Sequence, residues 1–260
     1  MNSASSADEA PVTSEHCSIH TEWAEAAAPE PCIDKGRRIF GLCLVLATAF
    51  SQCFLSSTFM FAGYAMPGPN DILTLRFANG LTVELVALGL LHYVLLQNGK
   101  KLSDIGFAFR WRDLRDGVKL IVGSSIAYAV AGFFIFRAYQ LLVKHPPARP
   151  QIAGEGVLSV WVLLLVVVNP FFEELIARAF TISEIRALGG GRALAVAISV
   201  GLQTSYHFYQ GVPYALMIGV LFLVYSLFYI RSGRIMPVII AHMWADFAGL
   251  ILYPWLRGQH

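Results

Sequence analysis

The stretch from Asn169 to Phe180 carries two adjacent carboxylates and an arginine directly after an uninterrupted apolar run, Val160 to Val168. Such a run is typical of a membrane-spanning helix, where an ionisable group costs roughly 2.5–3.5 kcal/mol on insertion scales and therefore usually marks function. Glu174 and Arg178 are four residues apart, so we expect an ion pair on one helix face. Glu173 lies about 100° around the helix and is free to face a cavity. The alternative is that all three groups neutralise one another in a structural clasp.

Two further pairs of polar residues lie four residues apart, which places each pair on one face of a helix: Gln203 with His207, and His242 with Asp246. A carboxylate held near a histidine in a dry cavity can deprotonate a water molecule. A second histidine or an amide can stabilise the oxyanion that then develops. The chemistry that this set favours is hydrolysis of a peptide bond within the membrane.

A zinc ion held by Glu173, His207 and His242 is an alternative, because two histidines and a glutamate form a known catalytic ligand set. The sequence contains no His-Glu-x-x-His helix, no Gly-x-Ser-x-Gly elbow and no Walker Gly-x-x-x-x-Gly-Lys loop. No metal ligands are therefore assigned, and zinc stays open as a cofactor.

The composition is that of a polytopic membrane protein. Of the 260 residues 56% are hydrophobic and only 14% are charged, whereas soluble domains carry nearer a quarter charged residues, and the mean hydropathy is +0.59. A formal net charge of +2 without a basic, aromatic-rich patch argues against nucleic acid as a partner. The four cysteines form no Cys-x-x-Cys pair and indicate no disulfide framework.

The apolar segments predict an all-α bundle of about seven transmembrane helices, with an eighth possible near residues 62–80. Residues 1–34 hold seven acidic residues and no Lys or Arg, so we expect a disordered acidic tail before a membrane domain, 35–260. Glu84 lies near the predicted membrane edge, where a solvated role suffices. The predicted helices cover about residues 39–62, 81–97, 120–143, 157–188, 193–210, 213–231 and 237–253.

Basic residues are distributed unevenly over the predicted loops. With the N-terminus inside, interior segments hold thirteen Lys and Arg residues and exterior segments hold five. The bias predicts that the N-terminus, the basic connector 98–119 and the turn from Arg231 to Arg234 all face the cytoplasm. We expect the protein to lie in the inner (plasma) membrane of a bacterium.

Helix geometry brings the polar groups to one site. Glu173 lies seventeen residues before Gly190, at the predicted reversal, and His207 lies seventeen residues after it. In an antiparallel hairpin both residues would lie about 25 Å from the turn, at the same membrane depth. His242 follows the Arg231–Arg234 turn by about 12 Å of helix, so it reaches the same site only with a tilt or a kink.

At these residues the sequence resembles the CAAX-protease and bacteriocin-processing (CPBP, or ABI) family of intramembrane proteases, which includes the type II CAAX prenyl endopeptidases. The family motifs are Glu-Glu-x-x-x-Arg, Phe-x-x-x-His and His-x-x-x-Asn or Asp. They match Glu173–Arg178, Gln203–His207 and His242–Asp246, within a resembling region of about 155–253. Gln203 replaces the family's usual aromatic residue, so we expect it to affect the substrate pocket or the oxyanion environment.

The resemblance implies an intramembrane endopeptidase, of the glutamic or the metallo type, with its catalytic motifs in residues 157–253. Its site would comprise Glu173, which activates the water, His207, which assists, and His242 with Asp246, which complete the site, beside the motif residues Glu174 and Arg178. The expected substrate is a membrane-anchored peptide or protein, CAAX-like or a leader peptide. Two alternatives stay open: a non-catalytic immunity or scaffold protein of this fold, and a proton-coupled transporter with Glu173, His207 and Asp246 as its relay.

Overall fold

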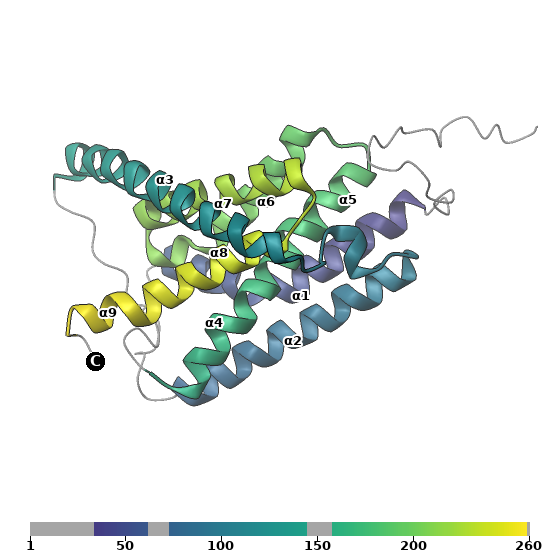
Figure 1. The fold of residues 1–260 in the computed structure, drawn as a ribbon, viewed down its shortest axis with the longest axis horizontal. Coiled ribbons are helices and arrows are strands. Elements are labelled where there is room, and N and C mark those ends of the chain that lie inside the picture. Colours follow the sequence, from purple (N-terminus) through teal and green to yellow (C-terminus); the bar gives the residue numbers. More distant parts are fainter. Residues whose placement is uncertain (1–33, 62–72, 145–157, 259–260) are drawn as a thin grey trace, which may run out of the picture.

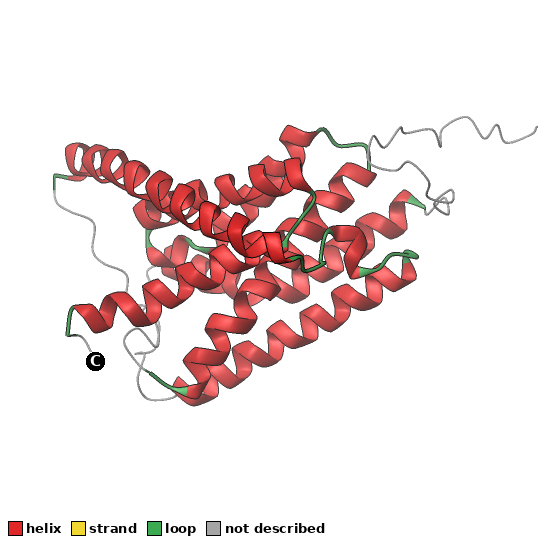
Figure 2. Ribbon diagram, in the orientation of Figure 1, coloured by secondary structure: helices red, strands yellow, loops and turns green. Residues whose placement is uncertain are grey.

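The computed structural model describes residues 34–61, 73–144 and 158–258, and these residues form helices joined by short loops, without a strand (Figures 1 and 2). The predicted acidic tail, apart from Asp34, lies outside the described residues. Of the segment 62–80, near which an eighth helix was predicted as possible, residues 62–72 also lie outside the described residues and residues 73–80 form the start of α2. The elements are α1 (Lys35–Phe61), α2 (Leu73–Gln97), the 3₁₀ turn η1 (Leu102–Ile105), α3 (Trp111–Val143), α4 (Val160–Glu173), the π-helix η2 (Glu174–Phe180), α5 (Thr181–Ala187), α6 (Arg192–Tyr206), the 3₁₀ turn η3 (Phe208–Gln210), α7 (Val212–Ser232), α8 (Met236–Phe247), the π-helix η4 (Ala248–Leu252) and α9 (Tyr253–Leu256).

Six helical segments of the described chain are long and apolar enough to cross a membrane. Two of these segments are the whole of α3 and the whole of α7, and two more are parts of α1 and α2. The other two are continuous helical runs of several elements, one from α4 through η2 to α5 and one from α8 through η4 to α9. The prediction of an all-helical, polytopic membrane bundle is therefore confirmed. The fifth predicted span is also helical, but α6 has only 15 residues, short of the roughly 20 that a full crossing requires.

Two helices begin earlier than the polarity of their first residues suggests. Helix α2 begins at Leu73, so Glu84 lies in the middle of the helix, and at 7% exposure it is buried in the bundle and does not have the predicted solvated role. Helix α3 begins at Trp111 inside the basic connector, because Asp113 in its first turn accepts a hydrogen bond from the backbone N–H of Arg110 at 2.7 Å. An acidic side chain that satisfies a free backbone donor in this way favours a helix start.

The segment with the two glutamates is a continuous helix whose central part is a π-helix. Pro170 in α4 has no N–H, so the α-helical bond to the carbonyl of Val166 cannot form. From Glu174 to Phe180 the backbone follows π-helical geometry, and the hydroxyl of Thr181 donates to the carbonyl of Ile176 at 2.8 Å. Short π-helical segments are uncommon and occur frequently at functional sites. All seven residues of this segment are buried, so it forms the centre of the bundle.

The other helices pack around this centre. Helix α3 crosses both α7 and α8, α6 packs on α7, and α2 packs on α4 (Figure 1). The turn before α8 is fixed by the loop after η1: the N–H of Ile235 donates to the carbonyl of Gly106 at 3.2 Å. Gly106 has φ +84° and lies against the backbone of Gly233, where a Cβ atom has no room. These contacts set the position from which α8 delivers His242.

Candidate active site

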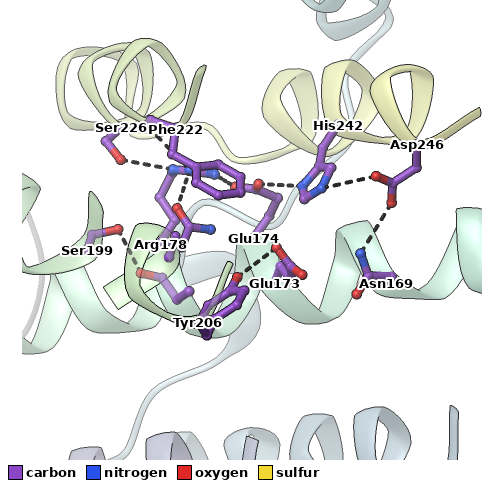
Figure 3. Close-up of polar contacts among 12 residues, drawn as sticks. Asn169, Glu173, Glu174, Arg178, Ser199, Tyr206, Phe222, Ser226, His242 and Asp246 are labelled. Carbon is purple, nitrogen blue, oxygen red and sulfur yellow. Dashed lines mark hydrogen bonds and ion pairs between the residues drawn. The ribbon is translucent and has the colours of Figure 1, made fainter. Parts of the chain in front are cut away.

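Glu174 is the centre of a buried network that joins two of the three motifs. Its carboxylate forms an ion pair with Arg178, as the spacing predicted, and its Oε1 lies 2.7 Å from Nδ1 of His242 on α8 (Figure 3). The side chains of Glu174 and Arg178 are fully buried, and that of His242 is 7% exposed. Both oxygens of the Glu174 carboxylate are thus in contact with partners, one with Arg178 and the other with His242.

Arg178 connects the π-helix to α6 and α7. Its guanidinium donates to Oε1 of Gln203 on α6 at 2.6 Å and to Oγ of Ser226 on α7 at 3.1 Å. It also lies over the rings of Phe222 and Tyr225, 5.6 and 5.4 Å from their centroids. With this set of acceptors and rings the buried charge is well compensated, which is the condition for keeping an arginine in a bundle core.

Glu173 has a different environment from its neighbour. Its Oε2 accepts a hydrogen bond from the hydroxyl of Tyr206 at 2.7 Å. The Tyr206 ring is buried and stacks on Phe50 of α1, with centroids 4.7 Å apart. No cation contacts Glu173 in the polar network of Figure 3, in which Arg178 pairs with Glu174. This carboxylate is therefore oriented by a hydroxyl and keeps its capacity to accept a proton.

His207 lies next to Tyr206, at the end of α6. Its Nδ1 lies 2.7 Å from the carbonyl oxygen of Gln203, and because a carbonyl can only accept, Nδ1 carries the proton of this bond. In the neutral ring Nε2 is then an acceptor. The imidazole packs against the rings of Tyr206 and Phe222, with centroids 4.7 and 5.3 Å away, and it lies within electrostatic range of Glu173.

His242 lies between two carboxylates. Besides its contact with Glu174, its Nε2 is 3.5 Å from Oδ1 of Asp246, one helical turn further along α8. The amide of Asn169 donates to Oδ2 of Asp246 at 3.2 Å, which links the motif of α8 to the start of the glutamate motif on α4. The ring of Phe222 separates the two histidines, with centroids 5.3 Å from His207 and 5.9 Å from His242.

The structure therefore brings the predicted catalytic residues into one region, by way of contacts that the spacing did not specify. Tyr206, Asn169 and Ser226 had not been singled out from the sequence. Asn169 begins the stretch that contains the two glutamates, and Tyr206 directly precedes the motif histidine His207. Their closeness to the motifs is the one feature of the sequence that could have indicated a role in the site. Gln203, the predicted substrate-binding residue, is fully buried and binds Arg178 through its side chain; its contact with a substrate stays a prediction.

The possible zinc set of Glu173, His207 and His242 does not fit the side chains as they are placed. Both ring nitrogens of His242 lie against carboxylates, Nδ1 at 2.7 Å from Glu174 and Nε2 at 3.5 Å from Asp246. Within the described residues no three His, Cys, Asp or Glu side chains are grouped so that they could hold a metal ion. We derive no catalytic step from a metal.

Comparison with known proteins agrees with the motifs. Residues 155–248 match a family model described as type II CAAX prenyl endopeptidase Rce1-like, and this range contains the glutamate motif and both histidine motifs. No curated protein and no solved structure matches the chain. The family predicted from the three motifs is therefore confirmed over the segment that forms the candidate active site.

Proposed function

We propose, for an integral membrane chain whose residues 155–248 belong to the Rce1-like type II CAAX prenyl endopeptidase family, that Glu173 activates a water molecule for hydrolysis of a peptide bond. The observation that carries this proposal is the different environment of the two adjacent glutamates. Glu174 is neutralised by Arg178 and bonded to His242, whereas Glu173 is oriented by the Tyr206 hydroxyl. Of the pair, Glu173 is thus the carboxylate that can take up a proton.

The reaction then proceeds by addition of water to the peptide carbonyl. Glu173 takes one proton of the water molecule while the water oxygen bonds to the carbonyl carbon, and the carbonyl oxygen becomes an oxyanion. The C–N bond breaks as this proton passes to the leaving nitrogen. Since Nε2 of His207 is an acceptor in the neutral ring, His207 is suited to hold the attacking water by its second hydrogen.

His242 is suited to the stabilisation of the oxyanion. The ring lies between two carboxylates, and in its imidazolium form it would place positive charge near a developing oxyanion, which lowers the barrier. Asp246 and Glu174 orient this ring, and Asn169 in turn orients Asp246. In this assignment Arg178 acts on the chemistry only through Glu174.

The substrate class follows from the location of the site. The motif residues lie within helices long and apolar enough to cross a membrane, or next to them, which favours a substrate that reaches the site from the membrane. We infer a substrate that is itself anchored to the membrane: a peptide with a lipid-modified, CAAX-like C-terminus or one with an apolar leader.

The test is cleavage by the purified protein in detergent micelles or liposomes. Prenylated CAAX peptides and apolar leader peptides are incubated with the protein and with a Glu173→Gln variant, and the products are identified by mass spectrometry. Cleavage of one peptide class by the unaltered protein alone supports the proposal. Binding without cleavage would indicate a non-catalytic protein of this fold, and proton flux across the liposome membrane would indicate a transporter.

A further inference from the structure

A third glutamate, Glu84, lies on the buried face of α2. This face is otherwise apolar: Ala87, Leu91 and Leu95 follow at helical spacing and each is 0% exposed, whereas Glu84 is 7% exposed. Among the described residues the Oε2 atom of Glu84 is buried and has no hydrogen-bond partner. With a leucine at this position the protein would be more stable, because burial of an unpartnered polar atom opposes folding. The presence of a glutamate at this buried position therefore indicates a role other than stabilising the fold.

Helix α2, which carries Glu84, packs on α4, which carries Glu173. Glu173 on α4 and Asp246 on α8 both act electrostatically on Glu84, and Glu84 and Glu173 both act on Cys53 of α1. The charges of the π-helix are engaged with each other, in the ion pair of Glu174 with Arg178. Glu84 thus approaches the space around Glu173 from α2, a helix that contributes nothing to the three motifs.

The charge balance decides which form of Glu84 is present. Carboxylates that share a buried site do not all ionise together, since like charges disfavour one another. Glu173 receives the hydrogen bond of Tyr206, and Asp246 receives that of Asn169. Glu84 has no such donor at Oε2, so it is the carboxyl that keeps its proton.

We propose that Glu84 is a substrate-binding residue whose protonated carboxyl hydrogen-bonds the backbone amide of the peptide next to the bond that is cleaved. A protonated carboxyl offers one O–H donor, which complements the C=O of a peptide unit, and one acceptor oxygen, which can take the N–H of a neighbouring peptide unit, since the C=O and N–H of one trans unit point in opposite directions. The oxygen that lacks a partner in the free protein gains one in the complex. This inference rests on the proposed peptidase function and adds a binding residue from outside the family motifs.

The experiment compares two substitutions of Glu84 with a control on the same helix. Glu84→Leu removes both hydrogen-bonding atoms, Glu84→Gln keeps a donor and an acceptor, and His92→Leu replaces an exposed polar residue of α2. For a peptide that the unaltered protein cleaves, we expect KM to rise about tenfold in Glu84→Leu, the scale of one lost hydrogen bond, with a smaller change in kcat. Glu84→Gln and His92→Leu should keep KM within about twofold on the same scale.

Thermal unfolding in detergent supplies a readout that does not need activity. Glu84→Leu should have a higher Tm than the unaltered protein, because the unpartnered oxygen is removed. A lower Tm, an unchanged KM in Glu84→Leu, or a KM in Glu84→Gln as high as in Glu84→Leu would overturn the inference while cleavage by the unaltered protein still supports the proposed function. Failure of the unaltered protein to cleave any peptide of either class would reject the proposed function and this inference with it.

Discussion

Glu173 and Glu174 are neighbours in the chain but bind different partners, and this difference predicts different consequences of substitution. Glu173→Gln preserves the shape of the side chain and its contact with Tyr206, but an amide cannot take the proton of a water molecule. We expect cleavage to fall by about 10²–10⁴, the usual scale for loss of a general base. Activity per mole of folded protein is the measurement, with Tm as the control. Near-full activity in a folded variant would refute the assignment of Glu173.

Glu174 is expected to support the fold and the site together. Glu174→Ala leaves Arg178 without its carboxylate in the core, and breaking a buried pair costs about 3–5 kcal/mol. The double variant Glu174→Ala with Arg178→Ala removes the unpaired charge as well, so it should recover part of the lost stability. Chemical denaturation in detergent measures both. Equal instability of the single and the double variant would contradict the ion pair as the cause.

Tyr206 is a positioning residue for Glu173 in this structure. Tyr206→Phe removes only the hydroxyl and keeps the ring that stacks on Phe50. Because a hydrogen bond to a charged group contributes about 1.5–3 kcal/mol, we expect activity to fall roughly ten- to hundredfold. Unchanged kcat and KM would show that the contact has no part in catalysis.

At the scale of elements, the sequence predicted the helical pairs and not the geometry that joins them. The four-residue spacings correctly placed Glu174 with Arg178 and His242 with Asp246, because within a helix such pairs need no knowledge of the fold. The contact between helices differed: Tyr206, and not His207, bonds Glu173. The prediction assumed ideal α-helices, whereas the segment from Glu174 to Phe180 is a π-helix, which changes the register of one partner. Nothing in the residue pattern of this segment indicates a π-helix.

The connection between η1 and the α7–α8 turn predicts a second effect at this scale. Gly106→Ala places a Cβ atom against the Gly233 carbonyl at a positive φ, so the turn before α8 must shift and His242 with it. We expect a loss of folded protein and of activity. Gly89→Ala is the matched control, because nothing lies within 4 Å of a Cβ atom there and alanine favours a helix. Similar Tm values for the two variants would contradict the role of the contact.

At the scale of the molecule, composition and apolar length sufficed for the fold class, since a bilayer leaves a chain this apolar few choices besides a helical bundle. The limits of the helices were harder to predict. Polar residues at the start of α3 had been assigned to the connector 98–119, and the glutamate in the middle of α2 had been assigned to the membrane edge. Such residues are tolerated inside a bundle when other helices cover or pair them, as Arg234 pairs with Asp113 and Asp116. That information is tertiary and absent from a local pattern.

The segments with most of the basic residues lie together at one end of the bundle. Arg37 at the start of α1 donates to the carbonyl of Gln97 at the end of α2, and Glu184 of α5 pairs with both Arg38 and Lys100. The pairs of Arg234 add the α7–α8 turn and the start of α3 to the same end. One orientation therefore places all these segments on the same side, and by the excess of basic residues we propose that this side is cytoplasmic.

Cysteine accessibility in intact cells tests this orientation. In a background without the four native cysteines, Ser103→Cys in η1 should resist a membrane-impermeant thiol reagent, because the reagent cannot reach the cytoplasmic side. Arg257→Cys, beyond α9, should react, since the run from α8 to α9 crosses the membrane once. Permeabilised cells, in which both positions should react, provide the control. Labelling of Ser103→Cys and protection of Arg257→Cys in intact cells would reverse the orientation. The assignment of the active site would be unchanged, because the site depends on contacts between helices and not on which end of the bundle faces the cytoplasm.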